Sequence, residues 1–145
     1  MKKITPFLWF NNNAEEAANY YVSLFKNSKI TIATPMMVSF VLDGQEFIGL
    51  NGGPQYTFTE AISMFVSCED QAEVDELWGK LLDGGEESQC GWLKDRFGLS
   101  WQIIPKALGE LMGDKDPMKV KRVTDAMLTM KKIDVSKLQA AYDEK

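Results

Sequence analysis

The amino-acid sequence predicts an α+β fold in which a strand–helix–three-strand module occurs twice and is followed by helices. Two observations support this prediction: the order of strand-like and helix-like segments repeats, and so does their spacing. The interval from Pro6 in a first strand to the hairpin glycine Gly44 nearly equals the interval from Ser63 to Gly98. Modules of this size are each too small for a full core, so we expect them to pair within a single domain, residues 1–145.

The first module, about residues 1–53, opens with a strand and a helix. Residues 4–10 (ITPFLWF) are rich in β-forming side chains and end at three asparagines, which favour a turn. Asn13, with Glu16 three positions later, matches the start of a capped helix. The apolar face expected for this helix consists of Ala14, Ala17, Ala18, Tyr21, Leu24 and Phe25.

Three further strands complete the first module. The first of them is expected at residues 29–34, and the other two, at 36–42 and 46–52, flank Asp43-Gly44. Asp-Gly accepts the positive φ values of a tight turn, so this pair predicts a β-hairpin.

The second module, about residues 60–105, repeats this order. Its strands are expected at residues 61–68, 86–89, 90–94 and 99–105. Asp70, with Glu73 at the box position, predicts the start of the helix that follows the first strand. Asp95 opens the turn between the last two strands, and we expect its carboxylate to hold that turn through local hydrogen bonds.

Residues 106–145 are expected to be helical. Asp116-Pro117 places an N-cap directly before a proline at a first helical position, and Ser136 is expected to start a last short helix. These helices could cover an edge strand or a partner subunit, and the sequence leaves both alternatives open.

Composition excludes several classes of function. A net charge of −5 argues against a nucleic-acid partner, because neutralising phosphates needs clustered Lys and Arg. The absence of histidine excludes Ser-His and Cys-His nucleophile pairs and His-ligated metals. The two cysteines, Cys68 and Cys90, read as small buried hydrophobes in a reducing compartment. No apolar segment approaches the ~18 residues of a membrane span, so we expect a cytoplasmic protein with no membrane partner.

Four stretches of the sequence resemble one protein family: ITPFLWF…AEEAANYYVSLF, LDGQEFIGLNGG, TEAISMFVSC and QCGWLKDRFGLSWQIIP. Together with the paired modules, they resemble the PhnB-like, 3-demethylubiquinone-methyltransferase-like branch of the vicinal oxygen chelate superfamily. That superfamily includes glyoxalase I, bleomycin-resistance proteins and extradiol dioxygenases. The resemblance extends over nearly the whole chain, including the C-terminal helices. One departure is the short connection at residues 34–37, where the branch usually has a longer, glycine-rich loop.

The resemblance implies a glyoxalase-like fold, in which two βαβββ modules form a curled mixed sheet around a cavity. In metal-using members, four strand positions point ligands into that cavity, and they are usually His, Gln or Glu. Carried over by motif, these positions fall on Pro6, Gly49, Ser63 and Gln102. Pro and Gly offer no side-chain ligand and Ser is a poor neutral one, so a divalent cation would lose hydration without adequate replacement. We therefore expect the metal site to be lost, with no metal or other cofactor.

Strand alternation predicts which side chains line the cavity instead. If Gln102 faces inward, Trp101 and Ile103 face the helix side, where we also expect Trp9. The residues expected to bind a ligand are Gln102, Asn51, Ser63, Ser100, Phe10, Phe47, Phe65 and Trp92. Such a lining suits a largely apolar small molecule held by a few hydrogen bonds. The alternative is that the phenylalanines collapse inward and leave no space for a ligand.

Three functions are compatible with this site. The first is a metal-free binding protein for a small aromatic or amphiphilic molecule, which the missing ligands and histidines favour. The second is a metal-independent enzyme in which Gln102, Asn51 or Ser63 polarises a substrate, although an acid–base partner would still be required. The third, a methyltransferase, follows the family label, but no glycine-rich nucleotide-binding turn is present. All three allow the homodimer that is common in the superfamily.

Overall fold

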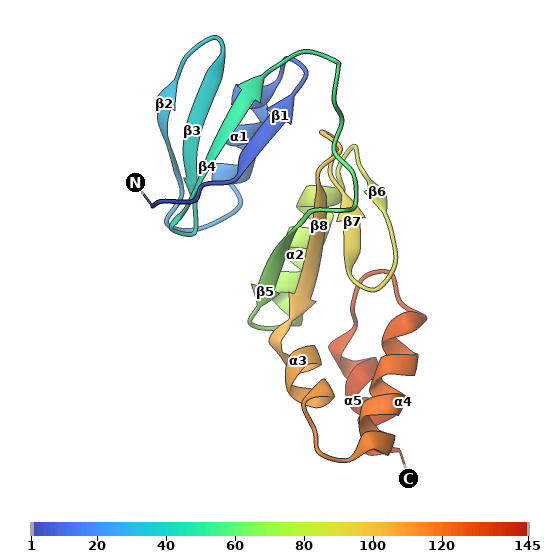
Figure 1. Cartoon of the computed structure of the whole chain (residues 1–145). Helices are drawn as coiled ribbons and strands as arrows, with labels where there is room; N and C mark the ends of the chain where they lie inside the picture. The colour runs from blue at the N-terminus through green and yellow to red at the C-terminus, as the bar shows by residue number, and fades with distance from the viewer. Residues whose placement is uncertain (1, 145) are drawn as a thin grey trace. The chain divides into compact units, whose positions relative to one another are not determined.

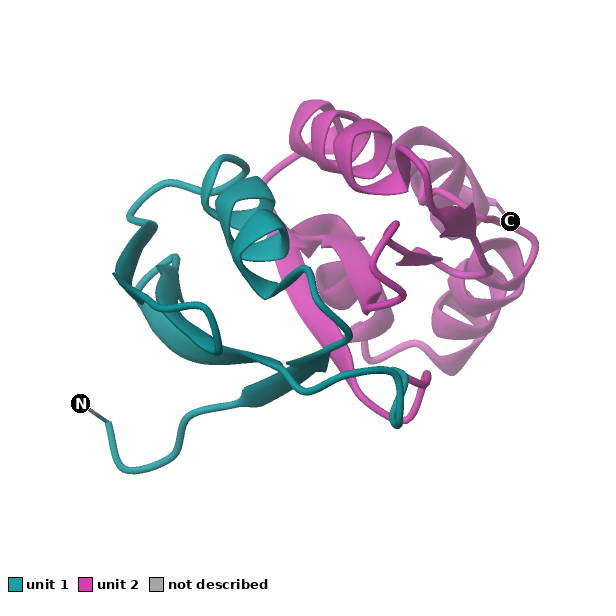
Figure 2. Ribbon diagram, turned by 90° about the horizontal axis from the view of Figure 1, so that it is seen from above, with its two compact units in different colours: residues 1–58 teal, residues 59–145 magenta. Residues whose placement is uncertain are grey.

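The computed structural model describes residues 2–144 and divides into two compact units, residues 1–58 and residues 59–145 (Figure 2). Each unit contains one βαβββ module, and the second unit also contains the C-terminal helices. The strands form two separate four-stranded mixed sheets. The predicted α+β class with two modules and C-terminal helices is therefore confirmed, whereas the single domain over the whole chain stays a prediction.

The first unit holds one helix and one mixed sheet. Its elements are β1 (Phe7–Phe10), α1 (Ala14–Val22), β2 (Lys29–Ala33), β3 (Met37–Leu42) and β4 (Gln45–Asn51). The strand order is β1-β4-β3-β2, with β1 parallel to β4 and β3 antiparallel to both of its neighbours (Figure 1). Helix α1 therefore connects the parallel edge strand to the antiparallel part of the sheet.

Both hairpin turns of the first unit follow from local chemistry. Asp43 and Gly44 have φ values of 48° and 81°, so both adopt the left-handed conformation predicted for the β3–β4 turn. At the β2–β3 turn, the Thr34 N–H donates to the Met37 carbonyl at 2.8 Å, and the Met37 N–H donates to Thr34 Oγ1 at 3.0 Å. The short connection at residues 34–37 is thus a closed tight turn.

The core of the first unit fills the space between α1 and the sheet. The helix buries three small residues and one aromatic one: Ala14, Ala17, Ala18 and Tyr21. Large side chains of the sheet occupy the space that the alanines leave, and the ring of Phe40 stacks on that of Phe47 with centroids 5.4 Å apart. Gly49 lets the helix approach, because a Cβ at this position would lie 3.1 Å from Val38 and 3.4 Å from Ala14. One face of this sheet is therefore fully used as core.

The second unit has the same strand order and carries three more helices. Its elements are β5 (Ser63–Cys68), α2 (Gln71–Leu82), β6 (Glu86–Glu87), β7 (Trp92–Lys94), β8 (Ser100–Pro105), α3 (Lys106–Met112), α4 (Pro117–Leu128) and α5 (Val135–Asp143). The strand order is β5-β8-β7-β6, with β5 parallel to β8 and the other pairs antiparallel. The topology of the first sheet thus recurs in the second, as the repeated spacing predicts.

Aspartates cap three helices of the second unit. The carboxylate of Asp70 accepts a hydrogen bond from the Glu73 N–H at 3.0 Å, and Asp116 caps α4 in the same manner, as predicted. Helix α5 is capped by Asp134, not started by Ser136. The predicted start is two residues late, because the Asp134 carboxylate accepts the cap bond from the Lys137 N–H at 3.3 Å. The Ser136 hydroxyl lies inside the first turn and donates to the same carboxylate at 2.6 Å.

The C-terminal helices pack within their own unit. Buried side chains of this region form a cluster with the end of β8: Ile104, Leu108, Val123, Met130, Ile133 and Leu138. Gln71, at the start of α2, clamps the segment before α5: its Nε2 donates to the Ile133 carbonyl at 2.9 Å, and its Oε1 accepts from the Val135 N–H at 2.8 Å. These contacts attach the helices to the end of β8, an inner strand of the sheet, and both alternatives, an edge strand and a partner subunit, stay predictions. Within residues 2–144, no helix is both long enough and apolar enough to cross a bilayer.

Candidate ligand-binding site

The sheet of the second unit has one face buried under α2 and one polar face. Trp101 and Ile103 are 2% and 0% exposed and lie on the helix-facing side, as alternation predicts. On the other face, the registers Ser63↔Ser100, Phe65↔Gln102 and Trp92↔Gln102 place five predicted site residues side by side: Ser63, Phe65, Trp92, Ser100 and Gln102. We call this surface the β8 face.

Gln102 has a polar partner on the neighbouring strand. Its side-chain Nε2 donates to the Ser63 hydroxyl at 2.9 Å, which links β8 to β5 across the β8 face. The amide oxygen of Gln102 and the hydroxyl hydrogen of Ser63 stay available for a further bond. The two predicted residues therefore form one polar unit with both an acceptor and a donor to offer.

Ser100 is the second polar feature of the β8 face. It is 1% exposed, and its hydroxyl has no hydrogen-bond partner among the described residues. A buried hydroxyl without a partner is costly, and native proteins keep few of them. Ser100 lines a hollow of about 250 Å³, together with Trp92, Lys94 and Glu60.

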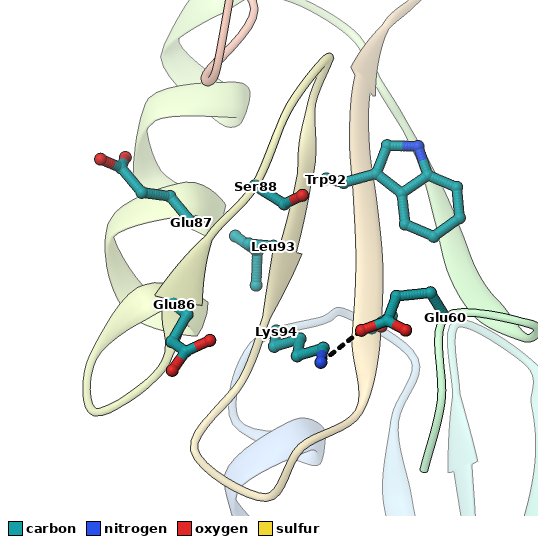
Figure 3. A pocket seen from close by; sticks show the side chains of 8 residues that line it. Glu60, Glu86, Glu87, Ser88, Trp92, Leu93 and Lys94 are labelled. Carbon is teal, nitrogen blue, oxygen red and sulfur yellow. Dashed lines mark ion pairs between the residues drawn. The ribbon is translucent and has the colours of Figure 1, made fainter.

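An ion pair lies at this hollow (Figure 3). The Lys94 ammonium on β7 pairs with the carboxylate of Glu60, which lies in the segment before β5. Hydrogen bonding between them lowers the pKa of Glu60 and raises the pKa of Lys94, so both groups are charged at neutral pH. Sequence reasoning missed this pair because two opposite charges on different segments leave no local signal.

Asp95 fixes the geometry of the strand that carries Gln102. Its Oδ1 accepts from the N–H groups of Phe97 at 2.8 Å and Leu99 at 3.1 Å, which confirms the predicted local turn. Its Oδ2 also accepts from the Trp101 indole N–H at 2.9 Å, a contact that the sequence did not indicate. The β7–β8 turn and the first residues of β8 are therefore held by one buried carboxylate.

In the first unit, the predicted facing of two phenylalanines is wrong. Phe10 is 2% exposed. Its ring lies next to Gly49, on the face of the sheet that Ala14 of α1 contacts. Phe47 is 7% exposed and stacks on Phe40. Both belong to the core beneath α1, and Phe47 also borders a small hollow of about 90 Å³ within the first unit. Because side chains alternate in a strand, an error of one residue in the assumed facing transfers the whole set to the opposite side.

Asn51 has a structural role instead of the predicted one. Its Oδ1 accepts from the Ala14 N–H at 2.9 Å, and its Nδ2 donates to the Pro35 carbonyl at 3.0 Å. Asn13, in contrast, makes no side-chain cap bond. The first N–H of α1 is thus capped from β4, which uses the amide that we expected to meet a ligand.

Trp9 also lies opposite to the predicted side. It alternates with the buried Leu8 and Phe10, its indole N–H donates to the Gly53 carbonyl at 2.9 Å, and its ring meets Tyr56 edge-on at 4.9 Å. A small hollow of about 90 Å³ on this side of the sheet includes Thr5, whose hydroxyl has no partner among the described residues. Nothing in the sequence around Thr5 indicates a functional role, because threonine is simply a common residue in β-strands.

The four positions carried over from metal-using proteins do not fit a divalent cation. Gly49 has no side chain and faces α1. Ser63 and Gln102 offer only neutral oxygens, and the Ser63 oxygen already accepts a hydrogen bond from the Gln102 amide. Divalent metal ions in proteins are mostly bound by carboxylate, imidazole or thiolate ligands. Among residues 2–144, no group of three or more Cys, Asp or Glu is arranged to hold a metal ion.

The two cysteines differ in environment. Cys68 is fully buried, and burial raises the pKa of its thiol to about 12, so it is an unreactive apolar residue at neutral pH. Cys90 is half-buried and has a φ of 58°, unusual for a residue with a side chain. Its N–H donates to the Met130 carbonyl at 2.8 Å, which ties the turn before β7 to the C-terminal helices.

Comparison with solved structures relates the chain to proteins of the expected fold. A PhnB protein from Bacillus cereus that carries a 3-demethylubiquinone-9 3-methyltransferase name is 35% identical, with a TM-score of 0.67 over 72% of this chain and 99% of that one. Protein PA1353 from Pseudomonas aeruginosa is 20% identical, with a TM-score of 0.61 over 72% and 98%. A glyoxalase-related enzyme from Fulvimarina pelagi is 13% identical, with a TM-score of 0.52 over 72% and 88%. The last two show the fold alone.

The family model named 3-demethylubiquinone-9 3-methyltransferase matches residues 2–104. None of the curated proteins matches the chain. The match ends inside β8, so the C-terminal helices lie outside it, although we expected the resemblance to include them. With most of its length matched, and with glyoxalase-like neighbours in structure, the chain belongs to the PhnB-like 3-demethylubiquinone-9 3-methyltransferase family.

Proposed function

We propose that this protein binds a small, largely apolar molecule on the β8 face, through hydrogen bonds and without a metal ion. The observation that carries the proposal is the unpartnered, buried hydroxyl of Ser100 beside the hydrogen-bonded pair of Ser63 and Gln102. Ser100 lines the hollow, and the other two residues lie on the same face of the sheet. A few polar groups with unused bonding capacity beside a hollow are typical of small-molecule sites.

The apolar part of this site comes from two aromatic side chains. Phe65 is 62% exposed although it is a large hydrophobic residue, and Trp92 is half-buried and borders the hollow. Exposed rings beside a few polar groups suit an aromatic or amphiphilic ligand. Phe10, Phe47 and Asn51 are not part of the proposed site, because they are used in the core and in the cap of α1.

The chemistry of the site favours binding over catalysis. The second candidate, a metal-independent enzyme, needs an acid or base next to the polarising amide. One carboxylate that lines the hollow is Glu60, and hydrogen bonding to the Lys94 ammonium lowers its pKa, which keeps it a weak base. No residue of this site supports the methyltransferase activity that the family name states. The homodimer expected from the superfamily stays a prediction.

Titration of the labelled full-length protein with benzyl alcohol, followed by NMR, tests the proposal. We expect shifts of the Gln102 side-chain amide and the Trp92 indole N–H, and about three- to tenfold weaker binding in Gln102→Ala, the effect of one hydrogen bond. Gln55→Ala removes an amide from an exposed position outside the site and should bind as the wild type does. A folded Gln102→Ala that binds with unchanged affinity would contradict the role of this amide, and one tightly held zinc, iron or nickel ion per chain would contradict the metal-free site.

A further inference from the structure

We infer that the ligand of the β8 face carries an ammonium group, and that Glu86 is the carboxylate that receives it. This inference rests on the proposed function, because it names the chemical class of the molecule that binds on the same face. Glu86 lies on β6, next to β7, and lines the hollow together with Ser100 and Trp92.

The carboxylates around the hollow are not equivalent. Glu60 is neutralised by its ion pair with Lys94. Glu87 is paired in register with the buried Leu93, which places it on the side of α2, and its carboxylate lies 3.6 Å from the Lys131 ammonium. Two of the three negative charges therefore already have a cation.

Glu86 is the carboxylate that remains. It is paired in register with Lys94 and so points to the β8 face, yet it forms no ion pair in the part of the chain that the structure describes. It acts on the Lys94 ammonium only through longer-range attraction, since that ammonium is bonded to Glu60. The β8 face thus carries one negative charge in excess, which attracts a cation and repels an anion.

Two neighbours make this charge part of a built site. Ser100 is 1% exposed and lines the same hollow, and its buried hydroxyl lacks a partner among the described residues. The Trp92 ring borders it as well, and an ammonium within about 6 Å of an indole face is attracted by the ring. Figure 3 shows Lys94 directed toward Glu60, with Glu86 on the adjacent strand. A molecule that combines an ammonium with a ring and a hydrogen-bonding group would use all three features.

Three probes with the same ring but different charge test the inference: benzylamine, benzyl alcohol and benzoate. Each is titrated into labelled full-length protein and followed by NMR. We expect benzylamine to bind most tightly, with shifts at Trp92, Ser100 and Glu86, and to bind about fivefold more weakly in Glu86→Gln, as for one unit charge at contact distance in water. Glu110→Gln, which removes the same charge from an exposed position on α3, should leave the affinity unchanged, and benzyl alcohol should not respond to either substitution.

The possible outcomes separate the inference from the proposed function. If benzyl alcohol binds as tightly as benzylamine, or if Glu86→Gln binds benzylamine as the wild type does, the inference is wrong and the proposed function stands. If benzoate binds most tightly, Lys94 is the residue that receives the ligand, and the inference is again wrong. If none of the three shifts the residues of the β8 face, both the inference and the proposed function are overturned.

Discussion

Asn51 reaches from the end of β4 to the first turn of α1 and supplies a cap from outside the helix. The first N–H groups of a helix have no partner within it, and a side-chain oxygen usually comes from the residue directly before the helix. Here the oxygen belongs to Asn51, and the same amide also binds the Pro35 carbonyl beside the β2–β3 turn. One side chain therefore joins three segments of the first unit.

Asn51→Ala should destabilise the first unit by about 1 to 2 kcal/mol, because it leaves the Ala14 N–H and the Pro35 carbonyl without their partners. Asn13→Ala is the matched control and should cost less than about 0.5 kcal/mol, since Asn13 makes no side-chain cap bond. Urea unfolding followed by circular dichroism measures both variants. Equal losses of stability would show that the cap from β4 is not a significant interaction.

The C-terminal helices are elements held by a few specific contacts. Gln71 binds the backbone on both sides of the turn into α5, and Lys132 pairs with Asp75 on α2 at 2.9 Å. The ion pair is exposed and contributes little, so the amide clamp and the buried cluster around Ile133 account for most of the attachment. The helices lie outside the matched family region, yet their core is continuous with β8 through Ile104.

Gln71→Ala should loosen the segment between α4 and α5. We expect a loss of about 1 to 2 kcal/mol from the two backbone hydrogen bonds, together with faster amide exchange of Val135, whose N–H loses its acceptor. Gln139→Ala, on the exposed side of α5, removes contacts with Asp143 alone and serves as the control. Hydrogen exchange measured by NMR compares the variants, and unchanged protection at Val135 would contradict the clamp.

The whole molecule consists of two units that should differ in their stability when isolated. The first has a single helix over its sheet, and its size is near the lower limit at which a domain folds alone without a metal or disulfide. The second adds the cluster beneath α3, α4 and α5 to the core between α2 and its sheet. The larger buried apolar surface should therefore make the second unit the more stable of the two.

A fragment of residues 59–145 should fold on its own, whereas a fragment of residues 1–58 should be largely unfolded. The expected observations are a dispersed amide spectrum and cooperative thermal unfolding for the longer fragment, and a collapsed spectrum for the shorter one. The full chain provides the reference spectrum. Non-cooperative unfolding of the longer fragment would show that its core depends on the first unit.

The local order of elements could be predicted from the sequence because its signals are short in range. Asp43-Gly44 specifies the β3–β4 hairpin, and Asp70 and Asp116 specify the starts of α2 and α4. The alternation in β8 specifies that Trp101 faces the helix. In the first unit the same alternation predicts two sets of side chains, but not which of them faces the helix. The three buried alanines of α1 were the signal that large rings of the sheet, among them Phe10 and Phe47, must fill the space beneath the helix.

The sequence by itself determined the α+β modules, the family and the placement of Gln102, Ser63 and Ser100 on one face. Only the tertiary structure decided that Asn51 is a cap, that Lys94 and Glu60 form an ion pair and that Glu86 remains without one. The physical reason is the range of the interactions. Periodicity and capping act over a few residues, whereas a hydrogen bond or an ion pair between distant segments depends on how the folded chain brings them together.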